Sequence, residues 1–486
     1  MRRLPGRPAG GASPGLLAFL GALAPYAVAV ARGPWASGAG FHLQQAALVA
    51  AGHWQALGGG PHPPPLMAVV NAAPVWLGLD RYALVVGLPV FWTAAVGLAT
   101  VACARRLVPG APPLLAWLLG AGYALFAVEF GGNLVTPEHA VVLWGLLAVA
   151  GFGPPERARP GNFAAAGLAC GLAGIWKPIA LVLVLPFALQ VRRPWQGLAL
   201  AAGGLAPFGV LVAWLGGDWR ALVSGATWLT GWTGHPAWEA WWRSLWRLKA
   251  EVLSLPVSVP AEFRRATLGV LAGLATGLAG LWVLGRWRED GAHRQGGWVA
   301  GWLGAGALLL ATRFVQDGPH HTLNCWVSLV VVWLGYLERY GPRHTLRAWG
   351  LTLAAGWGVV ALHAPWNPGY LQRLGQAGPL DAFFVPVARE VNRLVPARAS
   401  VVDAQPEPIL LFLAGRVPAN GKPTEGPISV TLVNGWVPPG RPCYVLASPV
   451  GAPTSTLVLQ LASDPRYELV AHWQAQGRHL QLYRRR

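Results

Sequence analysis

Long apolar runs separated by short polar segments repeat along most of the chain. A helix needs roughly 20 apolar residues to cross the hydrocarbon core of a bilayer, or somewhat fewer where it borders other helices. The pattern predicts such helices over residues 14–31, 82–103, 112–130, 137–152, 163–176, 178–191, 197–216, 267–285, 297–312, 322–337 and 348–363. We therefore expect a polytopic α-helical membrane protein with about 11 transmembrane helices.

The placement of arginine predicts the orientation of these helices, because short cytoplasmic loops collect Lys and Arg. With the N-terminus inside, every inner segment is basic; these segments hold Arg2, Arg3, Arg7, Arg105, Arg106, Arg157, Arg159, Arg192, Arg193, Arg286, Arg288, Arg294, Arg339, Arg343 and Arg347. Merging 163–176 with 178–191 across Lys177-Pro178 would move the later clusters outside, so we treat them as two spans. The expected protein is multi-pass, with a cytoplasmic N-terminus and an extracytoplasmic C-terminal part.

Two long outer segments are expected within the membrane domain of residues 1–363. The first outer loop, 32–81, contains an apolar stretch at 63–79 that begins with three prolines, which favours a helix resting at the interface over a full span. The second, 217–265, contains HPAWEAWWRSLWRLKAEVL, with tryptophans on one side of a helix and charges on the other. Such a helix lies on the membrane surface, either as an anchor without chemistry or as a wall beside a lipid-binding groove.

Residues 364–486 change to short β-rich runs separated by Pro, Gly and Asn. Strands are expected over 399–404, 409–415, 428–434, 443–448, 467–473 and 479–485, after one helix over 380–395. This order is typical of a small α/β domain of about 100 residues. Because the domain contains no Gly-rich phosphate loop, GxSxG elbow or HExxH motif, we expect a supporting or recognition role for it.

Composition agrees with a membrane protein and excludes other classes. Of the 486 residues, 54% are hydrophobic and only 12% are charged, with 27 Trp, which is not the composition of a soluble globular protein. The formal charge of +18 is spread over short clusters between apolar runs, so we exclude nucleic-acid binding. The four cysteines lie apart and form no disulfide framework or CxxC metal motif. The N-terminal run could pass for a signal peptide, but the many later spans favour a retained first span.

Ionisable residues at the outer mouths of the spans are candidates for chemistry, because charges near hydrocarbon are costly to keep. Glu129, Glu138 and His139 lie in EFGGNLVTPEH, between the third and fourth spans. Glu138 also fits the first turn of a helix, where a carboxylate complements the helix dipole, so a purely structural role is equally open. Lys177, one of three lysines in the chain, is suited either to neutralising a phosphate or to extending toward the headgroups.

A second group of candidates consists of polar residues of the outer loops, which could together bind a divalent cation. They are Arg313, Asp317, His320 and His321 of TRFVQDGPHH, with His42, His53 and His62 of the first outer loop. Their spacing is not that of a closed zinc motif. Polar loop residues without a metal are the simpler interpretation.

Several features of the chain occur together in one family of membrane enzymes. They are a basic N-terminus, one span, a long outer loop with Gly52 and then Pro64-Pro65-Leu66, a glutamate between the third and fourth spans, the run AAAGLACGLAGIWKPIALVLVLP, and an outer C-terminal domain. In this arrangement, over roughly residues 10–365, the chain resembles the C-type glycosyltransferase superfamily. The most similar branch is that of the bacterial relatives of protein O-mannosyltransferases and of the aminoarabinose transferase of lipid A.

This resemblance implies an enzyme of the bacterial plasma membrane. Such an enzyme transfers a sugar from a polyisoprenyl-phosphate donor to a glycan, lipid or protein acceptor at the outer face. In the family an aspartate near the start of the first outer loop usually activates the acceptor. Here no Asp or Glu occurs between Arg32 and Leu79.

The missing aspartate leaves the identity of the base open. His42 is the only titratable group near the expected place, and Glu138 or Asp317 are the carboxylates that could replace the aspartate. We expect the lipid phosphate and sugar of the donor to meet Lys177, Arg313 and His139. The alternative is a non-catalytic protein that keeps the scaffold and binds a lipid-linked sugar or assists an assembly. A transporter fits less well, because the chain shows no inverted-repeat halves.

Overall fold

The computed structural model describes most of the chain. The described residues are 14–32, 37–53, 66–129, 136–214, 276–277, 279–285, 293–316, 319–363, 378–405, 409–420, 429–436, 442–449, 454–475 and 477–486. Helices dominate this part, and a small sheet lies near the C-terminus. Residues 54–65 and 215–275 lie outside the described residues. They include the expected interfacial helix at 235–253 and much of the predicted span 267–285.

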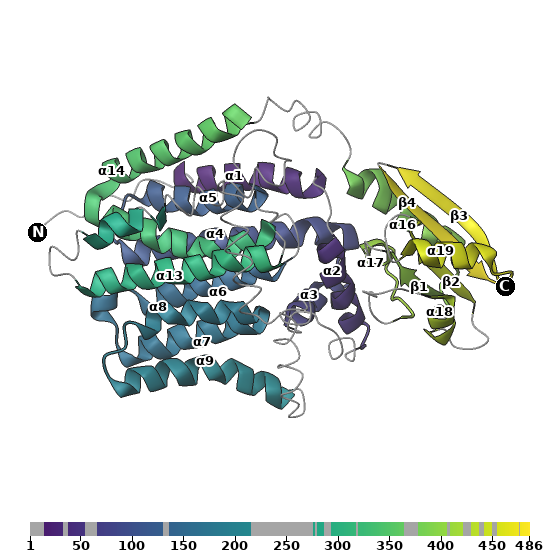
Figure 1. The fold of residues 1–486 in the computed structure, drawn as a ribbon, viewed down its shortest axis with the longest axis horizontal. Coiled ribbons are helices and arrows are strands. Elements are labelled where there is room, and N and C mark those ends of the chain that lie inside the picture. The colour runs from purple at the N-terminus through teal and green to yellow at the C-terminus, as the bar shows by residue number, and fades with distance from the viewer. Residues whose placement is uncertain are drawn as a thin grey trace, which may run out of the picture.

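A bundle of apolar helices forms the N-terminal three quarters of the molecule (Figure 1). Its helices are α1 (Pro14–Arg32), α4 (Arg81–Leu107), α5 (Pro113–Glu129), α6 (Pro137–Phe152), α7 (Pro160–Trp176), α8 (Leu185–Ala188), α9 (Pro194–Trp214), α13 (His293–Gln316) and α14 (Trp326–His363), with the short helices η2 (Pro155–Arg157), η3 (Pro178–Val184) and η4 (Pro319–Cys325). Most of these bounds follow the predicted apolar runs, but the span predicted over 178–191 is wrong as one α-helix, because this stretch forms the 3₁₀ helix η3 and the four-residue helix α8. Two segments, Arg81–Leu107 and Pro194–Ala213, are by length and composition apolar enough to cross a bilayer, and shorter apolar helices make up much of the rest of the bundle.

Helices α7 and α9 run parallel in tight contact. A side-chain carbon added at Gly167 would lie 2.1 Å from the carbonyl oxygen of Leu200, and one added at Gly174 would lie 2.9 Å from the ring of Phe208. The contacts therefore advance in the same direction along both helices. Two parallel neighbours require the chain to return between them, and residues 178–193 make this return through η3 and α8. The prediction that the chain reverses at Lys177-Pro178 is confirmed.

Helix α14 contains the last two predicted spans. Gly341 interrupts it with φ 75° and ψ 173°, a left-handed backbone conformation that glycine adopts without steric cost. The kink falls between the predicted spans 322–337 and 348–363, and Pro342 follows it directly. The two halves are therefore separate straight helices joined at one glycine, as the apolar pattern predicts.

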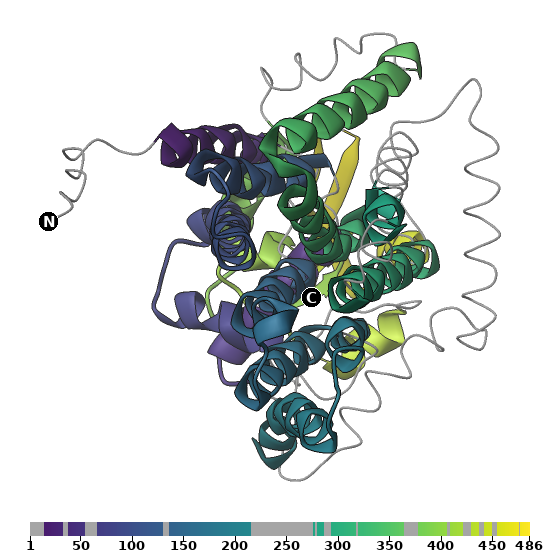
Figure 2. The same cartoon turned by 90° about the vertical axis from the view of Figure 1, so that its left-hand side faces the viewer.

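The connections from α4 to α5 and from α6 to α7 lie at one end of the bundle, the end that faces the viewer in Figure 2, and arginines lie within or just before them in the sequence. Arg105 and Arg106 lie in the last turn of α4, and the guanidinium of Arg105 lies 5.6 Å from the ring centre of Trp117 at the start of α5. Arg106 lies beside Gly153, which ends α6. Helices α2 and α3 and the C-terminal part of the chain lie at the opposite end (Figure 1). The arginines at the end of α4 therefore lie at the end of the bundle opposite the C-terminal part.

Two short helices, α2 (Ser37–Ala50) and α3 (Leu66–Trp76), form a layer between the bundle and the C-terminal part. The helix α3 occupies the stretch that the proline triplet predicts to be interfacial. Asp80 then caps α4, since its side chain accepts a hydrogen bond of 2.8 Å from the backbone N–H of Ala83. The next residue contacts the C-terminal part, since the Arg81 guanidinium lies 4.8 Å from the ring centre of Phe412.

The C-terminal part is an α/β unit, as predicted. Its helices are η5 (Leu380–Phe384), α16 (Val385–Leu394), α17 (Ile409–Leu413), α18 (Val430–Trp436) and α19 (Thr454–Ser463), and its strands are β1 (Ser400–Ala404), β2 (Cys443–Ala447), β3 (Tyr467–Ala475) and β4 (Arg478–Arg485). The strands lie in the order β1-β2-β4-β3, with β1 and β2 parallel and the other pairs antiparallel. The segments 409–415 and 428–434 were predicted as strands and this is wrong, because they form α17 and α18.

Both faces of this sheet are covered. On one face Val401, Tyr444 and Leu446 belong to the same apolar core as the bundle and α17. On the other, Val402 and Val445 pack against α18 and α19. A strand that is buried on both faces reads as a continuous apolar run, and a short run of this kind cannot be told from a buried helix by periodicity. This is why the sequence did not separate α17 from the strands.

Candidate functional site

Glu138 and Lys177 meet inside the bundle as an ion pair between Nζ of the lysine and Oε1 of the glutamate. Glu138 lies in the first turn of α6, which follows the N-cap Thr136. Lys177 is the C-cap of α7 with an extended backbone, φ −160° and ψ 118°, because the following Pro178 disfavours a helical conformation there. Two helix ends, 39 residues apart in sequence, thus bring a carboxylate and an ammonium together.

The pair is deeply buried. The exposed fraction is 0% for Glu138 and 6% for Lys177. Removing two charges from water costs several kcal/mol for each ion, and their mutual attraction offsets this only in good geometry. Both residues also take part in further interactions. The pair therefore holds the end of α6 against the end of α7, and neither charge can be removed alone without a large cost.

A second polar contact lies next to the ion pair along α6. The Tyr123 hydroxyl and the Nδ1 atom of His139 share a hydrogen bond of 2.8 Å, and both side chains are fully buried. The Tyr123 ring also packs 5.4 Å, centre to centre, from the ring of Trp326. We call Tyr123, Glu138, His139 and Lys177 the α5–α6–α7 polar cluster. It lies at the end of the bundle that faces α2, α3 and the C-terminal part.

The remaining sequence-predicted residues are not part of this cluster in the described structure. His42 lies in α2 and is half-buried. Other candidates lie outside the described residues: all of His62, and the side chains of Glu129, Arg313, Asp317, His320 and His321. Within the part of the chain that the structure describes, no group of three or more His, Cys, Asp or Glu side chains is placed to hold a metal ion. The proposed divalent cation therefore has no site among those residues.

One carboxylate that no sequence pattern marks lies beside the first outer loop. Asp403 is the next-to-last residue of β1, and its Oδ2 accepts a hydrogen bond of 2.9 Å from the side-chain amide of Gln44 in α2, 359 residues earlier. Asp403 is 2% exposed and Gln44 0%. The carboxylate that the first outer loop lacks is thus present next to α2, but it comes from the C-terminal sheet. No local pattern could reveal this, since the contact depends on how the sheet docks.

Burial controls the protonation of Asp403. Desolvation raises the pKa of its carboxyl to about 7, against opposing hydrogen bonds from Gln44 and Gln405. At neutral pH the group is therefore close to half-protonated. Such a carboxyl can accept the amide N–H of Gln44 in either protonation state.

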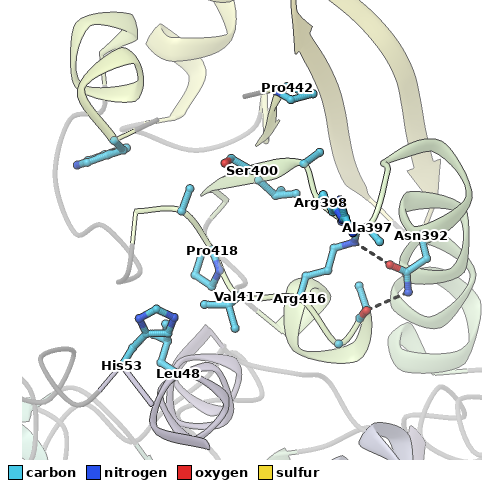
Figure 3. Close-up of a pocket in the computed structure, with 16 residues that line it drawn as sticks. Leu48, His53, Asn392, Ala397, Arg398, Ser400, Arg416, Val417, Pro418 and Pro442 are labelled. Atoms are coloured by element: carbon cyan, nitrogen blue, oxygen red, sulfur yellow. Dashed lines mark hydrogen bonds between the residues drawn. The ribbon is translucent and has the colours of Figure 1, made fainter. Parts of the chain in front are cut away.

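A cavity of about 1020 Å³ lies in the same region, between α2 and the C-terminal α/β unit. His53 and Leu48 line it from the α2 side, while Arg398, Arg416 and Asn392 line it from the opposite side (Figure 3). Glu138 and Lys177 do not line this cavity. The structure therefore contains two separate polar features, the buried α5–α6–α7 polar cluster and an open basic cavity.

Comparison of the chain with protein-family models, with curated proteins and with solved structures found no match.

Proposed function

We propose that this protein is a multi-pass membrane glycosyltransferase, which transfers a sugar from a polyisoprenyl-phosphate donor to an acceptor at the outer face of the bilayer. The observation that carries the proposal is the meeting of Glu138 and Lys177 at the mouth between α6 and α7. A carboxylate and an ammonium at one place are the two groups that the transfer requires. Apolar helices, and basic residues at the opposite end of the bundle, support the membrane placement.

The proposed reaction uses these groups in sequence. The donor phosphate approaches the ammonium of Lys177, which then shares its hydrogen bonds between the phosphate and Glu138. The Glu138 carboxylate takes the proton of the acceptor hydroxyl, whose oxygen forms a bond to the anomeric carbon. The bond from that carbon to the phosphate oxygen breaks, and its electron pair leaves with the polyisoprenyl phosphate. Lys177 stabilises the charge on the leaving phosphate, so positioning and electrostatics supply the catalysis.

The neighbouring groups support this geometry in different ways. The hydrogen bond between Tyr123 and His139 fixes the ring of the residue that follows Glu138, and so keeps the first turn of α6 in place. His42 lies in α2 and stays a predicted alternative to Glu138 as the base. Arg313 and Asp317 stay predictions for the donor and the base respectively.

A test of this function measures sugar transfer by the purified protein in liposomes. Radiolabelled mannose, glucose and aminoarabinose, each linked to polyisoprenyl phosphate, serve as donors, and a membrane glycolipid extract serves as acceptor. We expect transfer or slow donor hydrolysis with one donor, and a loss of at least about 100-fold in E138Q and K177M, which is the usual scale of a general base or a charge stabiliser. The matched control is E156Q, whose exposed carboxylate lies in η2 at the basic end of the bundle. Full activity of both cluster variants would refute the assignment.

A second candidate is a non-catalytic protein that binds a lipid-linked sugar. The observation in its favour is that Glu138 and Lys177 are buried and neutralise each other, which is also how a structural ion pair looks. The same liposomes separate the two functions. A binder retains a labelled polyisoprenyl-phosphate sugar in wild type without releasing or transferring the sugar, whereas an enzyme turns it over.

A further inference from the structure

The cavity between α2 and the C-terminal α/β unit is positively charged. Its lining includes the two arginines Arg398 and Arg416 and the histidine His53, and no Asp or Glu among the residues that the structure describes (Figure 3). Its volume of about 1020 Å³ is at the upper end of the range of sites for small organic ligands. A single inorganic ion would leave most of this space empty. The size and the charge together indicate an organic anion.

Arg416 is held rigidly at the wall of this cavity. Its Nε donates a hydrogen bond of 2.8 Å to Oδ1 of Asn392, and its two terminal nitrogens donate to the backbone carbonyls of Pro396 and Val395. Asn392 in turn donates a hydrogen bond of 2.9 Å to the carbonyl of Ala414. All these acceptors are neutral oxygens. The guanidinium is thus fixed in position while its positive charge is not cancelled by a carboxylate.

Arg398 adds a second charge to the same wall. Its side chain is exposed, and among the described residues it has no hydrogen-bond or ion-pair partner. The nearby Arg393, by contrast, forms an ion pair with Glu390 on the outer side of α16. Two guanidinium groups that line one cavity, with no carboxylate beside them in the described part of the chain, repel each other, and an oxyanion between them relieves this repulsion. Guanidinium groups match phosphate and carboxylate through paired hydrogen bonds.

The other walls are suited to a ring rather than to a flexible chain. They include the half-buried Trp436, with Pro418 and Pro442, besides the polar Ser400 and Asn392. An aromatic face beside hydroxyl and amide groups fits a saccharide, which presents apolar C–H faces and hydroxyl edges. We propose that this cavity binds an acidic saccharide, with Arg398 and Arg416 on its phosphate or carboxylate group and the sugar against Trp436. That the saccharide is the acceptor of transfer rests on the proposed function; the binding site itself does not.

Direct binding tests the site. The probes are fluorescently labelled pentamannose phosphate and tetragalacturonate, with neutral maltopentaose as the reference, added to the full-length protein in phosphatidylcholine nanodiscs. We expect both acidic probes to bind more tightly than the neutral one, and binding to weaken as salt is raised. R398Q should weaken acidic binding about tenfold, since one charge-assisted hydrogen bond contributes on the order of 1.5 kcal/mol. The matched control R393Q should bind like wild type, because Arg393 is an arginine five residues away that does not line the cavity.

Three outcomes would overturn the proposal: equal binding of neutral and acidic probes, unchanged binding in R398Q, or equal loss in R393Q. Vesicles of phosphatidylglycerol, added as a competitor, identify the source of the anion. Displacement of the probe supports the same oxyanion site with a lipid headgroup as ligand, and retention of the probe supports a glycan. The E138Q protein should bind the acidic probes normally. Failure of transfer by the wild-type protein, with its binding of the acidic probes intact, would therefore refute the proposed function and leave the binding site standing.

Discussion

The carboxyl of Asp403 provides the sharpest test of how the C-terminal sheet docks on α2. Replacing Asp403 with Asn keeps the shape of the side chain and keeps an oxygen that can accept the hydrogen bond of 2.9 Å from Gln44. What the substitution removes is the ability to ionise. Any difference between the two proteins that depends on pH therefore reports the buried carboxyl and not the contact itself.

The size and sign of the effect follow from the pKa. Burial raises the pKa of Asp403 from 3.8 to about 7 in the folded protein. The pKa of Asp403 is higher in the folded than in the unfolded protein. The protonated carboxyl therefore makes its whole contribution to stability below pH 3.8, and this contribution is lost as the pH rises through about 7. Between about pH 5 and about pH 8 the linkage amounts to a loss of about 3 kcal/mol from the free energy of unfolding. D403N has no such loss, so at pH 8 it should be the more stable protein.

Thermal unfolding of both proteins in nanodiscs, followed by tryptophan fluorescence from pH 5 to pH 8, measures this. We expect the wild-type midpoint to fall with rising pH relative to that of D403N. Asp464 is the matched control in the same unit, because its ion pair with Arg466 lowers the pKa of its carboxyl and its linkage therefore lies below pH 3.8. D464N should thus retain the wild-type pH profile above pH 5. Parallel profiles for wild type and D403N would show that Asp403 is not buried as described.

Two further predictions concern the bundle. K177M should lower the free energy of unfolding by about 3–5 kcal/mol, because it leaves the carboxylate of Glu138 buried without its partner. The double variant E138Q/K177M should recover much of this loss. Additive losses of the two single variants in thermal unfolding would contradict a buried pair. G167L should destabilise the protein by about 3 kcal/mol or more, because a side chain there collides with the Leu200 carbonyl, 2.1 Å from the added carbon. Its control is G209L, where no atom lies within 4 Å of the added carbon, and equal midpoints for both variants would contradict the close contact of α7 and α9.

The local pattern of apolar and basic residues was sufficient to predict many helices of the bundle. The apolar runs predicted α6 at its observed bounds, and arginine placement required the reversal at Lys177 that the structure confirms. Pro178 and the lysine at the end of an apolar run marked a helix end from sequence alone. The predicted candidates Glu138 and Lys177 both prove to be buried and polar, but their direct contact was beyond reach, because it depends on the packing of α6 against α7.

The sequence failed where packing decides the structure. The run ILLFLAG forms α17 because Ile409 to Phe412 are buried on all sides between the sheet and α2, so the run has no polar positions to show a helical period. Asp403 was missed because its partner Gln44 belongs to a distant segment. Arg398 was missed because one arginine in a loop carries no signal. Its meaning comes only from the cavity it lines.

The segment that connects α7 to α9 has a consequence for the biosynthesis of this protein. The 3₁₀ helix η3 rises about 2.0 Å per residue and the α-helix about 1.5 Å, so the tighter helix reaches farther with fewer residues. Even so, Pro178–Ala188 is too short to be stable in lipid before its neighbours exist. Under the proposed membrane placement, we expect the ribosome to have synthesised α9 before this segment settles, so that residues 160–214 enter the bilayer as one unit.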